Sequence, residues 1–357
     1  MAGLLVPLAQ QVINFSEIEP LSGAYNLPEV VNLKSETWFS GEFQQKYSPY
    51  YEYKIGFRSS LVRLRNQLYY WAYGESTNYV VIGKENQLYA WNYWAPFGGL
   101  DLVPDSVVES NVNNLKLLEA KLNEMGVPLL VVIGANKARL SISHMPSNYK
   151  EGETLPNNYR NYISAMSKAN LPVVDFNAVF KDLKKDHGLK LFPNTGTHWS
   201  GLGMSLCLDS ILAFANRKNA DDLAQARVMG SFLADSTLES DVDLSNDLNL
   251  IYPLKTERNL FANTQLTSGR KANLFVIGDS FYWNLYQLND FYATVDSSSH
   301  YWYYNNTDID FISTREAVEN FDPVKLASKA DAVVIVATEA NLHLFPFGFP
   351  EEFLENF

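Results

Sequence analysis

One short segment of the chain has the residue types and spacing of a nucleophilic turn. An apolar run at residues 274–277 ends abruptly in Gly278-Asp279-Ser280, and aromatic residues follow. The carboxyl end of a buried parallel strand is where open α/β sheets bind ligands, and backbone N–H groups there can receive an oxyanion. Ser280 is therefore a candidate nucleophile. The alternative is an ordinary turn, since glycine, aspartate and serine all favour turns.

A histidine lies in a second segment that is rich in small residues. His198 occurs in the sequence Thr-Gly-Thr-His-Trp-Ser-Gly at residues 195–201, before an apolar stretch, which predicts a loop that opens into a helix. An imidazole that titrates near neutral pH can take a proton from a serine hydroxyl. His198 is therefore a candidate general base. The other histidines are expected to be ordinary surface or structural residues: His144, His187, His300 and His343.

The two motifs, in the order Thr-His-Trp and then Gly-Asp-Ser-Phe, resemble the SGNH-hydrolase-like polysaccharide O-acetyltransferases, the family of the alginate enzymes AlgX and AlgJ. In that family the histidine motif also precedes the serine motif. Upstream segments are similar to an opening helix, an R-x-x-L helix, a V-I-G-K hairpin and a P-N-K strand end of the family: residues 38–43, 57–61, 80–89 and 131–138. Taken in order, the resemblance covers about residues 35–345.

One position departs from the family pattern. The family motif is Asp-x-His, whose aspartate orients the imidazole, and this chain has Gly196 in its place. Loss of such a carboxylate costs about 10⁴ in rate in the serine-protease template. Three explanations stay open: Asp175 is a relocated acid, a backbone carbonyl orients the ring of a Ser-His dyad, or the domain has lost activity and only binds glycan. The presence of Ser280, His198 and Trp199 together favours the first two.

The resemblance implies a ping-pong acyl transfer. His198 would deprotonate Ser280, which takes an acetyl group from a donor and passes it to a sugar hydroxyl. With water as the acceptor, the same pair would make a carbohydrate esterase or deacetylase. Four more residues are expected at the oxyanion position or the cleft: Asn136, Trp199, Tyr286 and Asp279. Each also has an ordinary structural interpretation, as a turn residue or as packing.

The resemblance also implies partners and a location. A polysaccharide is the expected acceptor, and a membrane-bound O-acyltransferase is the expected source of the acetyl donor. The protein is expected in the periplasm or another extracytoplasmic space. The sequence contains no stretch of 18 apolar residues and opens with Met-Ala-Gly, so we expect the signal or anchor of an exported protein to be absent from it. Sequence alone also permits a cytosolic protein.

Composition limits the classes of partner and cofactor. The net charge of −12 argues against nucleic acid or an anionic membrane, which both need a basic face on the protein. It also disfavours a polyanionic glycan unless a local basic groove exists. The single cysteine, Cys207, excludes intrachain disulfides and a cysteine-built zinc site, and we expect it to be buried. Without metal-ligand spacing or a nucleotide fingerprint, the sequence predicts no metal and no cofactor.

Aromatic residues make up 14% of the chain, and most are expected to pack in the core. The dense run at residues 297–306 is the exception, because its polar flanks suggest an exposed surface on which sugar rings stack.

Continuous apolar runs that alternate with helical patterns predict an α/β fold, because strands buried on both faces read as unbroken apolar segments. We expect an SGNH-hydrolase-like, flavodoxin-like α/β/α sandwich with a mostly parallel sheet. Its strands are predicted at residues 79–82, 128–133, 171–175, 272–277 and 332–337. The domain organisation is predicted as an N-terminal extension at residues 1–34, one SGNH-like domain at 35–345 with a polar insertion near 217–255, and a C-terminal tail at 346–357.

Overall fold

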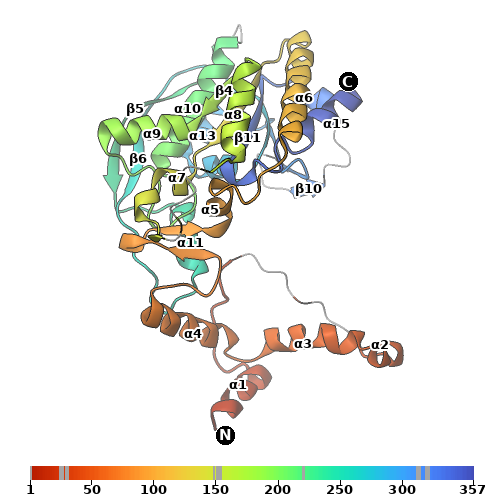
Figure 1. Cartoon of the computed structure of the whole chain (residues 1–357), viewed down its shortest axis with the longest axis vertical. Helices are drawn as coiled ribbons and strands as arrows, with labels where there is room; N and C mark the ends of the chain where they lie inside the picture. Colours follow the sequence, from red (N-terminus) through yellow and green to blue (C-terminus); the bar gives the residue numbers. More distant parts are fainter. Residues whose placement is uncertain are drawn as a thin grey trace. The chain divides into compact units, whose positions relative to one another are not determined.

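The chain folds into two compact units in a computed structural model (Figure 1). Unit 1 comprises Met1–Val81 and Asp243–Lys255, and unit 2 comprises Ile82–Val242 and Thr256–Phe357. The structure describes residues 2–23, 28, 32–147, 149, 155–218, 222–310, 315–317 and 322–357.

Unit 1 is helical. Its helices are α1 (Ala2–Ile13), α2 (Ser35–Phe39), α3 (Glu42–Lys54), α4 (Arg58–Tyr73) and α11 (Asp243–Asp247). The side chains of α4 hold the segment 243–255, which returns from far along the chain. The amide of Asn66 donates to the Leu248 carbonyl (3.0 Å), and the amide oxygen of Gln67 accepts from the Tyr252 N–H (2.9 Å).

A seven-stranded sheet forms the centre of unit 2, in the order β10-β9-β8-β7-β11-β3-β4. The last five strands in that order are parallel, and β9 and β10 are antiparallel. The bounds are β3 (Leu129–Gly134), β4 (Val173–Asp175), β7 (Leu274–Gly278), β8 (His300–Tyr303), β9 (Thr307–Asp310), β10 (Arg315–Ala317) and β11 (Ala332–Thr338). Every residue of β3, β7 and β11 is buried, as expected for strands covered on both faces. The carboxyl ends of the five parallel strands form one edge of the sheet.

Helices cover this sheet. The longer ones are α6 (Asp105–Glu124), α8 (Asn158–Lys168), α9 (Phe176–His187), α10 (Gly201–Lys218) and α15 (Phe349–Asn356). The shorter ones are α5 (Trp91–Phe97), α7 (Lys137–Leu140), α12 (Ser280–Trp283), α13 (Asn289–Thr294) and α14 (Pro323–Ala327). In Figure 1, α6, α8 and α15 lie beside one another. The apolar stripe of α6, from Val108 to Leu122, packs on β3 and β11 and on Phe349 and Phe353 of α15. The predicted α/β fold with a mostly parallel sheet is confirmed.

Two sequence-based expectations about this sheet are wrong. The run at residues 79–82 gives β1 (Val80–Ile82), which forms a separate two-stranded sheet with β2 (Leu88–Ala90). Val80 is buried, but Val81 and Ile82 are only partly buried, so β1 lacks the two covered faces of a central strand. The aromatic run at 297–306 contains β8, in which Tyr301 and Trp302 are buried beside β7. These two rings fill the core, so they do not form an exposed stacking surface.

The range 217–255, for which the sequence predicts a polar insertion, contributes to both units. Its described residues include β5 (Ala226–Ala234), which pairs antiparallel with β6 (Asn259–Leu266), and the 3₁₀ turn η4 (Glu239–Asp241). Residues 243–255 belong to unit 1, and residues 219–221 lie outside the described residues. Among the residues that the structure describes, no helix has the length and apolar character needed to cross a lipid bilayer.

Candidate active site

Ser280 is the first residue of α12, immediately after β7 and its Asp279 cap. The end of β7 lies close to β11, because a β-carbon at Gly278 would lie 2.7 Å from the carbonyl oxygen of Val336. Asp279 provides the N-cap of α12, since its Oδ1 accepts from the N–H of Phe281 (3.1 Å). Ser280 itself is only partly buried. The local sequence thus places a hydroxyl at the carboxyl edge of the sheet.

Asp279 ties this turn to the end of the neighbouring strand β11. Its Oδ2 accepts three hydrogen bonds, from the Thr338 N–H (2.7 Å), the Thr338 hydroxyl (2.9 Å) and the amide of Asn341 (2.8 Å). Its backbone carbonyl accepts from the hydroxyl of Tyr301 (2.6 Å). Asp279 is completely buried. Its side chain therefore anchors the turn beneath Ser280 and does not face the solvent.

The structure brings His198 to Ser280. The distance from His198 Nε2 to Ser280 Oγ is 3.0 Å, which is a hydrogen bond. The imidazole ring also packs on the ring of Phe281, with 5.0 Å between their centroids. Both His198 and Ser280 are partly exposed, so a substrate can reach them. A serine hydroxyl bonded to an imidazole has the arrangement of an activated nucleophile and its base.

The loop that carries His198 is held by a buried cation. Lys137 follows β3 and has only 2% of its surface exposed. Its ammonium donates to the carbonyls of Pro193 (2.6 Å), Asn194 (3.2 Å) and Gly196 (2.6 Å), and it lies 5.5 Å from the ring centre of Tyr89. Three donors of one ammonium thus fix three carbonyls of the loop. This role was not predicted from the sequence, although the Asn-Lys pair at the strand end was part of the family resemblance.

Packing explains the glycine at position 196. A β-carbon there would press against the carbonyl oxygen of Ser240 and lie 2.9 Å from Pro193 Cγ and 3.0 Å from the carbonyl carbon of Asp241. The hydroxyl of Thr195 donates to the carbonyl of Asp241 (2.7 Å) and locks the two segments together. The backbone of η4 therefore occupies the space that an aspartate side chain at position 196 would need.

A model of a known protein family matches about half of the chain. Residues 91–275 match the family described as the SGNH hydrolase-like domain of acetyltransferase AlgX, a match that includes His198 and ends before Ser280. The chain belongs to the AlgX acetyltransferase-domain family. The predicted family resemblance is thereby confirmed.

The solved structures similar to this AlgX-family chain include two from Pseudomonas and one from Bacillus, and no curated protein matches the chain. The O-acetyltransferase domain of Pseudomonas putida AlgJ is 15% identical over 74% of this chain and 92% of its own, with a TM-score of 0.44. Pseudomonas aeruginosa AlgX is 11% identical over 76% of this chain and 67% of its own, with a TM-score of 0.46. Bacillus cereus PatB1 is 10% identical over 67% of this chain and 91% of its own, with a TM-score of 0.39.

Two residues predicted for the AlgX-like site have local structural partners. Asp175 ends β4 and caps α9, since its Oδ1 accepts from the Asn177 N–H (3.0 Å) while its Oδ2 accepts from the Tyr159 hydroxyl (2.7 Å). Both carboxylate oxygens thus have partners other than His198. Asn136 is buried as the cap of α7, where its Oδ1 accepts from the Ala138 N–H and its Nδ2 donates to the Tyr93 carbonyl, each at 2.8 Å.

The two aromatic residues predicted for the cleft, Trp199 and Tyr286, contribute to packing. Trp199 is fully buried and packs edge-on against Phe176 and Phe281, at 5.5 and 5.0 Å between ring centres. Trp199 thus packs against Phe281, the same ring that the imidazole of His198 contacts. Tyr286 lies in the 3₁₀ turn η5 (Asn284–Gln287) and packs on Phe291, with 4.6 Å between their ring centres. It is partly exposed.

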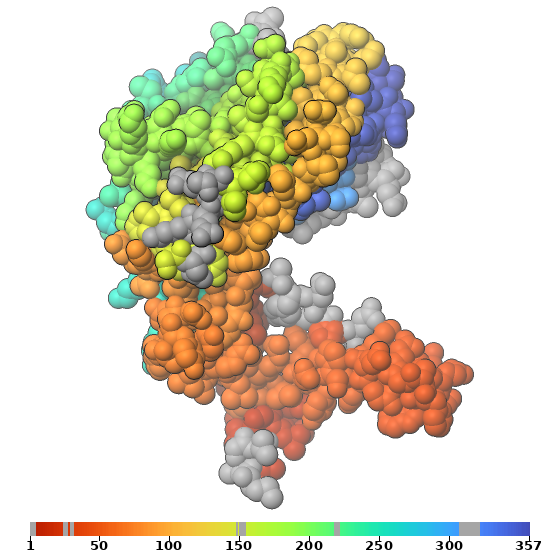
Figure 2. Space-filling model, in the orientation of Figure 1, coloured from red at the N-terminus to blue at the C-terminus, as the bar shows by residue number. Residues whose placement is uncertain are grey.

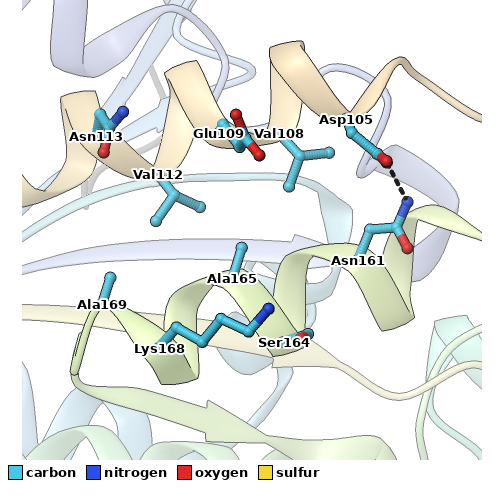
Figure 3. A pocket seen from close by; sticks show the side chains of 10 residues that line it. All are labelled: Asp105, Val108, Glu109, Val112, Asn113, Asn161, Ser164, Ala165, Lys168 and Ala169. Atoms are coloured by element: carbon cyan, nitrogen blue, oxygen red, sulfur yellow. Dashed lines mark hydrogen bonds between the residues drawn. The ribbon is translucent and has the colours of Figure 1, made fainter.

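A surface pocket of about 520 Å³ lies between α6 and α8. These helices run side by side at the surface of unit 2 (Figure 2). Figure 3 shows Asp105 of α6 accepting a hydrogen bond from the amide of Asn161 on α8 (3.2 Å). None of the residues that line this pocket was predicted for the site, and Ser280 and His198 are not among them. We assign it no part in the chemistry.

Proposed function

We propose that this chain is a polysaccharide O-acetyltransferase that works through an acetyl-enzyme on Ser280. Membership of the AlgX acetyltransferase-domain family supports the class of reaction. The observation that carries the residue assignment is the 3.0 Å contact between His198 Nε2 and Ser280 Oγ at the carboxyl edge of the sheet.

In the first half-reaction, His198 takes the hydroxyl proton of Ser280 while Oγ attacks the carbonyl carbon of the acetyl donor. The bond from that carbon to the donor's leaving group breaks, and the leaving group receives the proton from His198. In the second half-reaction, His198 takes the proton of a sugar hydroxyl, whose oxygen attacks the acetyl carbon. The bond from that carbon to Ser280 Oγ breaks, and Oγ receives the proton from His198. General base catalysis of this kind contributes about 10² to 10⁴ in rate.

We propose a Ser-His pair whose geometry is set by the loop itself. Lys137 holds three carbonyls of the loop at residues 193–196, and the backbone at residues 240–241 packs against Gly196. The proposal does not depend on Asp175, whose carboxylate oxygens bond to Asn177 and Tyr159. The orienting aspartate of the family motif is thus replaced by support from the backbone of neighbouring segments.

We propose further that the protein works outside the cytoplasmic membrane and receives its acetyl groups from a membrane-bound O-acyltransferase. The support for this is membership of the AlgX family. An acetylated exported polysaccharide is then the product.

The division of acetyl groups between a sugar acceptor and water tests the proposed transfer. The protein is mixed with p-nitrophenyl acetate and a series of oligosaccharides, and acetylated sugar and free acetate are both quantified. We expect acetylated sugar to form at the expense of acetate as the acceptor concentration rises, with neither product above background for Ser280→Ala. Release of acetate alone with every acceptor would instead indicate an esterase, which uses the same pair with water.

A further inference from the structure

In the helix α4 of unit 1 (Figure 1), the apolar side is exposed and the polar side is buried. Four large side chains repeat at intervals of three and four residues and so share one face, the outer face of α4: Leu61, Leu64, Leu68 and Trp71. They are 44% to 62% exposed. Asn66 and Gln67 lie on the opposite side and are buried against the segment 243–255. Helices of globular proteins normally have the reverse arrangement, with the apolar stripe toward the core.

The helix α1 shows the same reversal. Its buried side chain is polar, since Gln10 is 3% exposed and donates to the carbonyl of Ser16 (2.6 Å). Its exposed side chains at intervals of three and four residues are apolar: Leu5, Leu8 and Val12. The helix has no charged residue. Exposed apolar faces of this kind mark surfaces that bind a partner, so we expect unit 1 to be covered by one.

The charges of α4 indicate the chemistry of that partner. The helix has three arginines and no acidic residue, in a chain with a net charge of −12: Arg58, Arg63 and Arg65. Arg58 and Arg65 are seven residues apart and follow one edge of the outer face. Arg63 pairs with Glu19 (3.9 Å). Among the described residues, neither Arg58 nor Arg65 forms an ion pair with a carboxylate.

Two occupants fit the spacing of the outer face, and the arginines distinguish them. A second copy of α4 would bring the same three arginines and no carboxylate to pair with them. The phosphates of an anionic lipid membrane would pair with arginine, and its acyl boundary accepts leucine and tryptophan, as in helices that lie in the membrane interface. The net charge of −12 opposes such a surface only weakly, because charges more than about 8 Å away are screened at physiological ionic strength.

We propose that the outer face of α4 binds the surface of an anionic lipid membrane, with its apolar side chains in the boundary between headgroups and acyl chains and with Arg58 and Arg65 at the phosphates. The helix lies on the membrane and does not cross it, in keeping with its 16 residues and three charges. The inference goes beyond the proposed acetyl transfer and does not depend on it.

The first test is co-sedimentation of the full chain with vesicles of phosphatidylcholine mixed with phosphatidylglycerol, and with vesicles of phosphatidylcholine alone, at low and high salt. We expect binding to the mixed vesicles that weakens as salt rises, and about tenfold weaker binding to phosphatidylcholine alone. Leu64→Gln/Leu68→Gln is expected to weaken binding about tenfold, because two apolar side chains no longer enter the membrane. The matched control, Leu117→Gln/Leu266→Gln, changes two leucines of similar exposure in unit 2 and should leave binding unchanged.

A second pair of variants tests the charge. Arg65→Gln is expected to weaken binding to the mixed vesicles about fivefold, the contribution of one basic residue at an anionic surface. Lys325→Gln makes the same change in net charge at an exposed position of unit 2 and should have no effect. Equal weakening by the two variants would show that net charge, and not α4, governs binding, and would overturn the proposal.

Further measurements separate the membrane from a second copy. The substituted leucines are exposed, so we expect the variants to fold, and the unfolding midpoint in urea checks this. A dimer in analytical ultracentrifugation that Leu64→Gln/Leu68→Gln dissociates, in a protein that does not bind the mixed vesicles, would overturn the proposal in favour of an interface between two copies. Failure of the folded wild type to bind the mixed vesicles, or equal binding by Leu64→Gln/Leu68→Gln, would also overturn it.

The inference and the proposed function fail in different ways. Vesicle binding is measured without any acetyl donor, and acetylation of Ser280 by p-nitrophenyl acetate is measured without any lipid. Acetylation without vesicle binding would remove only the membrane surface of α4. Vesicle binding without acetylation of Ser280 would remove the proposed reaction and leave that surface in place.

Discussion

At the scale of single residues, the nucleophile depends on a buried carboxylate that does no chemistry itself. Asp279 accepts four hydrogen bonds through its side chain, from Phe281, Thr338 (twice) and Asn341. The position next to Ser280 in the sequence suggested a residue of the cleft. The hydrogen bonds show a structural anchor, and no local sequence pattern distinguishes these two roles.

Replacement of this carboxylate tests the anchor. Asp279→Asn turns an NH₂ group toward donors that need an acceptor, so we expect the free energy of unfolding to fall by about 3 kcal/mol. Urea unfolding measures the change. Asp186→Asn, at an exposed position of α9, is the matched control and should change stability by less than about 0.5 kcal/mol. A similar small effect for both variants would contradict the anchor.

Restoring the family aspartate should harm this chain. Gly196→Asp creates the Asp-x-His motif, but its side chain must enter space filled by the backbone of Ser240 and Asp241. We expect at least tenfold slower acetylation of Ser280 and a loss of about 1 to 3 kcal/mol in stability, as overpacking typically costs. Stopped-flow release of p-nitrophenol measures the rate.

The control for position 196 is the same substitution at a glycine with free space around it. A β-carbon at Gly230 meets nothing within 4 Å, so Gly230→Asp should leave the acetylation rate unchanged. Faster acetylation by Gly196→Asp would show that the loop has room for the aspartate and that the packing argument is wrong.

At the scale of elements, long buried runs were predictable and short amphipathic ones were not. The runs that became β3, β7 and β11 are unbroken apolar segments, and the long helix α6 has its buried leucines at helical spacing. The strand β8 was missed because its sequence, His-Tyr-Trp-Tyr, is aromatic and polar-flanked. The burial of β8 depends on its pairing with β7, and the sequence of the β8 segment alone does not reveal this pairing.

The loop that carries His198 also depends on a contact that its own sequence does not reveal. Its residues and the order of the motifs were visible in the sequence, and so was the departure at Gly196. The partner of the loop, Lys137, lies more than fifty residues upstream, and only the fold brings its ammonium under the loop.

Removal of this ammonium tests how the loop is held. Lys137→Met keeps most of the side-chain volume but leaves the carbonyls of Pro193, Asn194 and Gly196 without this donor. We expect Ser280 acetylation to slow by about 10²-fold, the cost of misplacing a catalytic group by about 1 Å. The rate is compared with that of Lys325→Met, an exposed lysine outside the loop. An unchanged rate for Lys137→Met would show that other contacts suffice to place His198.

The helix α10 offers a test of its packing through the single cysteine. Cys207 is fully buried, as expected from the sequence, and burial raises the pKa of its thiol. Because the thiolate is the reactive species, we expect no labelling by a thiol reagent at about pH 8 in the native protein and prompt labelling in denaturant. Mass spectrometry counts the labels. Rapid labelling of the native protein would mean that α10 is not packed as described.

At the scale of the whole molecule, unit 1 is assembled from distant parts of the chain. The segment 243–255 bonds to α4 through Asn66 and Gln67, and Tyr252 stacks on Trp71 with 6.1 Å between ring centres. We expect deletion of residues 1–73 to remove hydrogen-exchange protection from the amides of 243–255, because their partners are gone. Peptide-level hydrogen exchange measures this. Unchanged protection of that segment would contradict its assignment to unit 1.

The central claim is that Ser280 forms an acetyl-enzyme with His198 as its base. Intact-mass and peptide mass spectrometry after brief exposure to p-nitrophenyl acetate tests this claim most directly, with Ser280→Ala and His198→Ala alongside the wild type. The account predicts one acetyl group on Ser280 in the wild type, none on the α12 peptide of Ser280→Ala, and strongly reduced acetylation in His198→Ala. A folded wild-type protein that carries no acetyl group on Ser280, or a His198→Ala variant acetylated as fast as wild type, would contradict it.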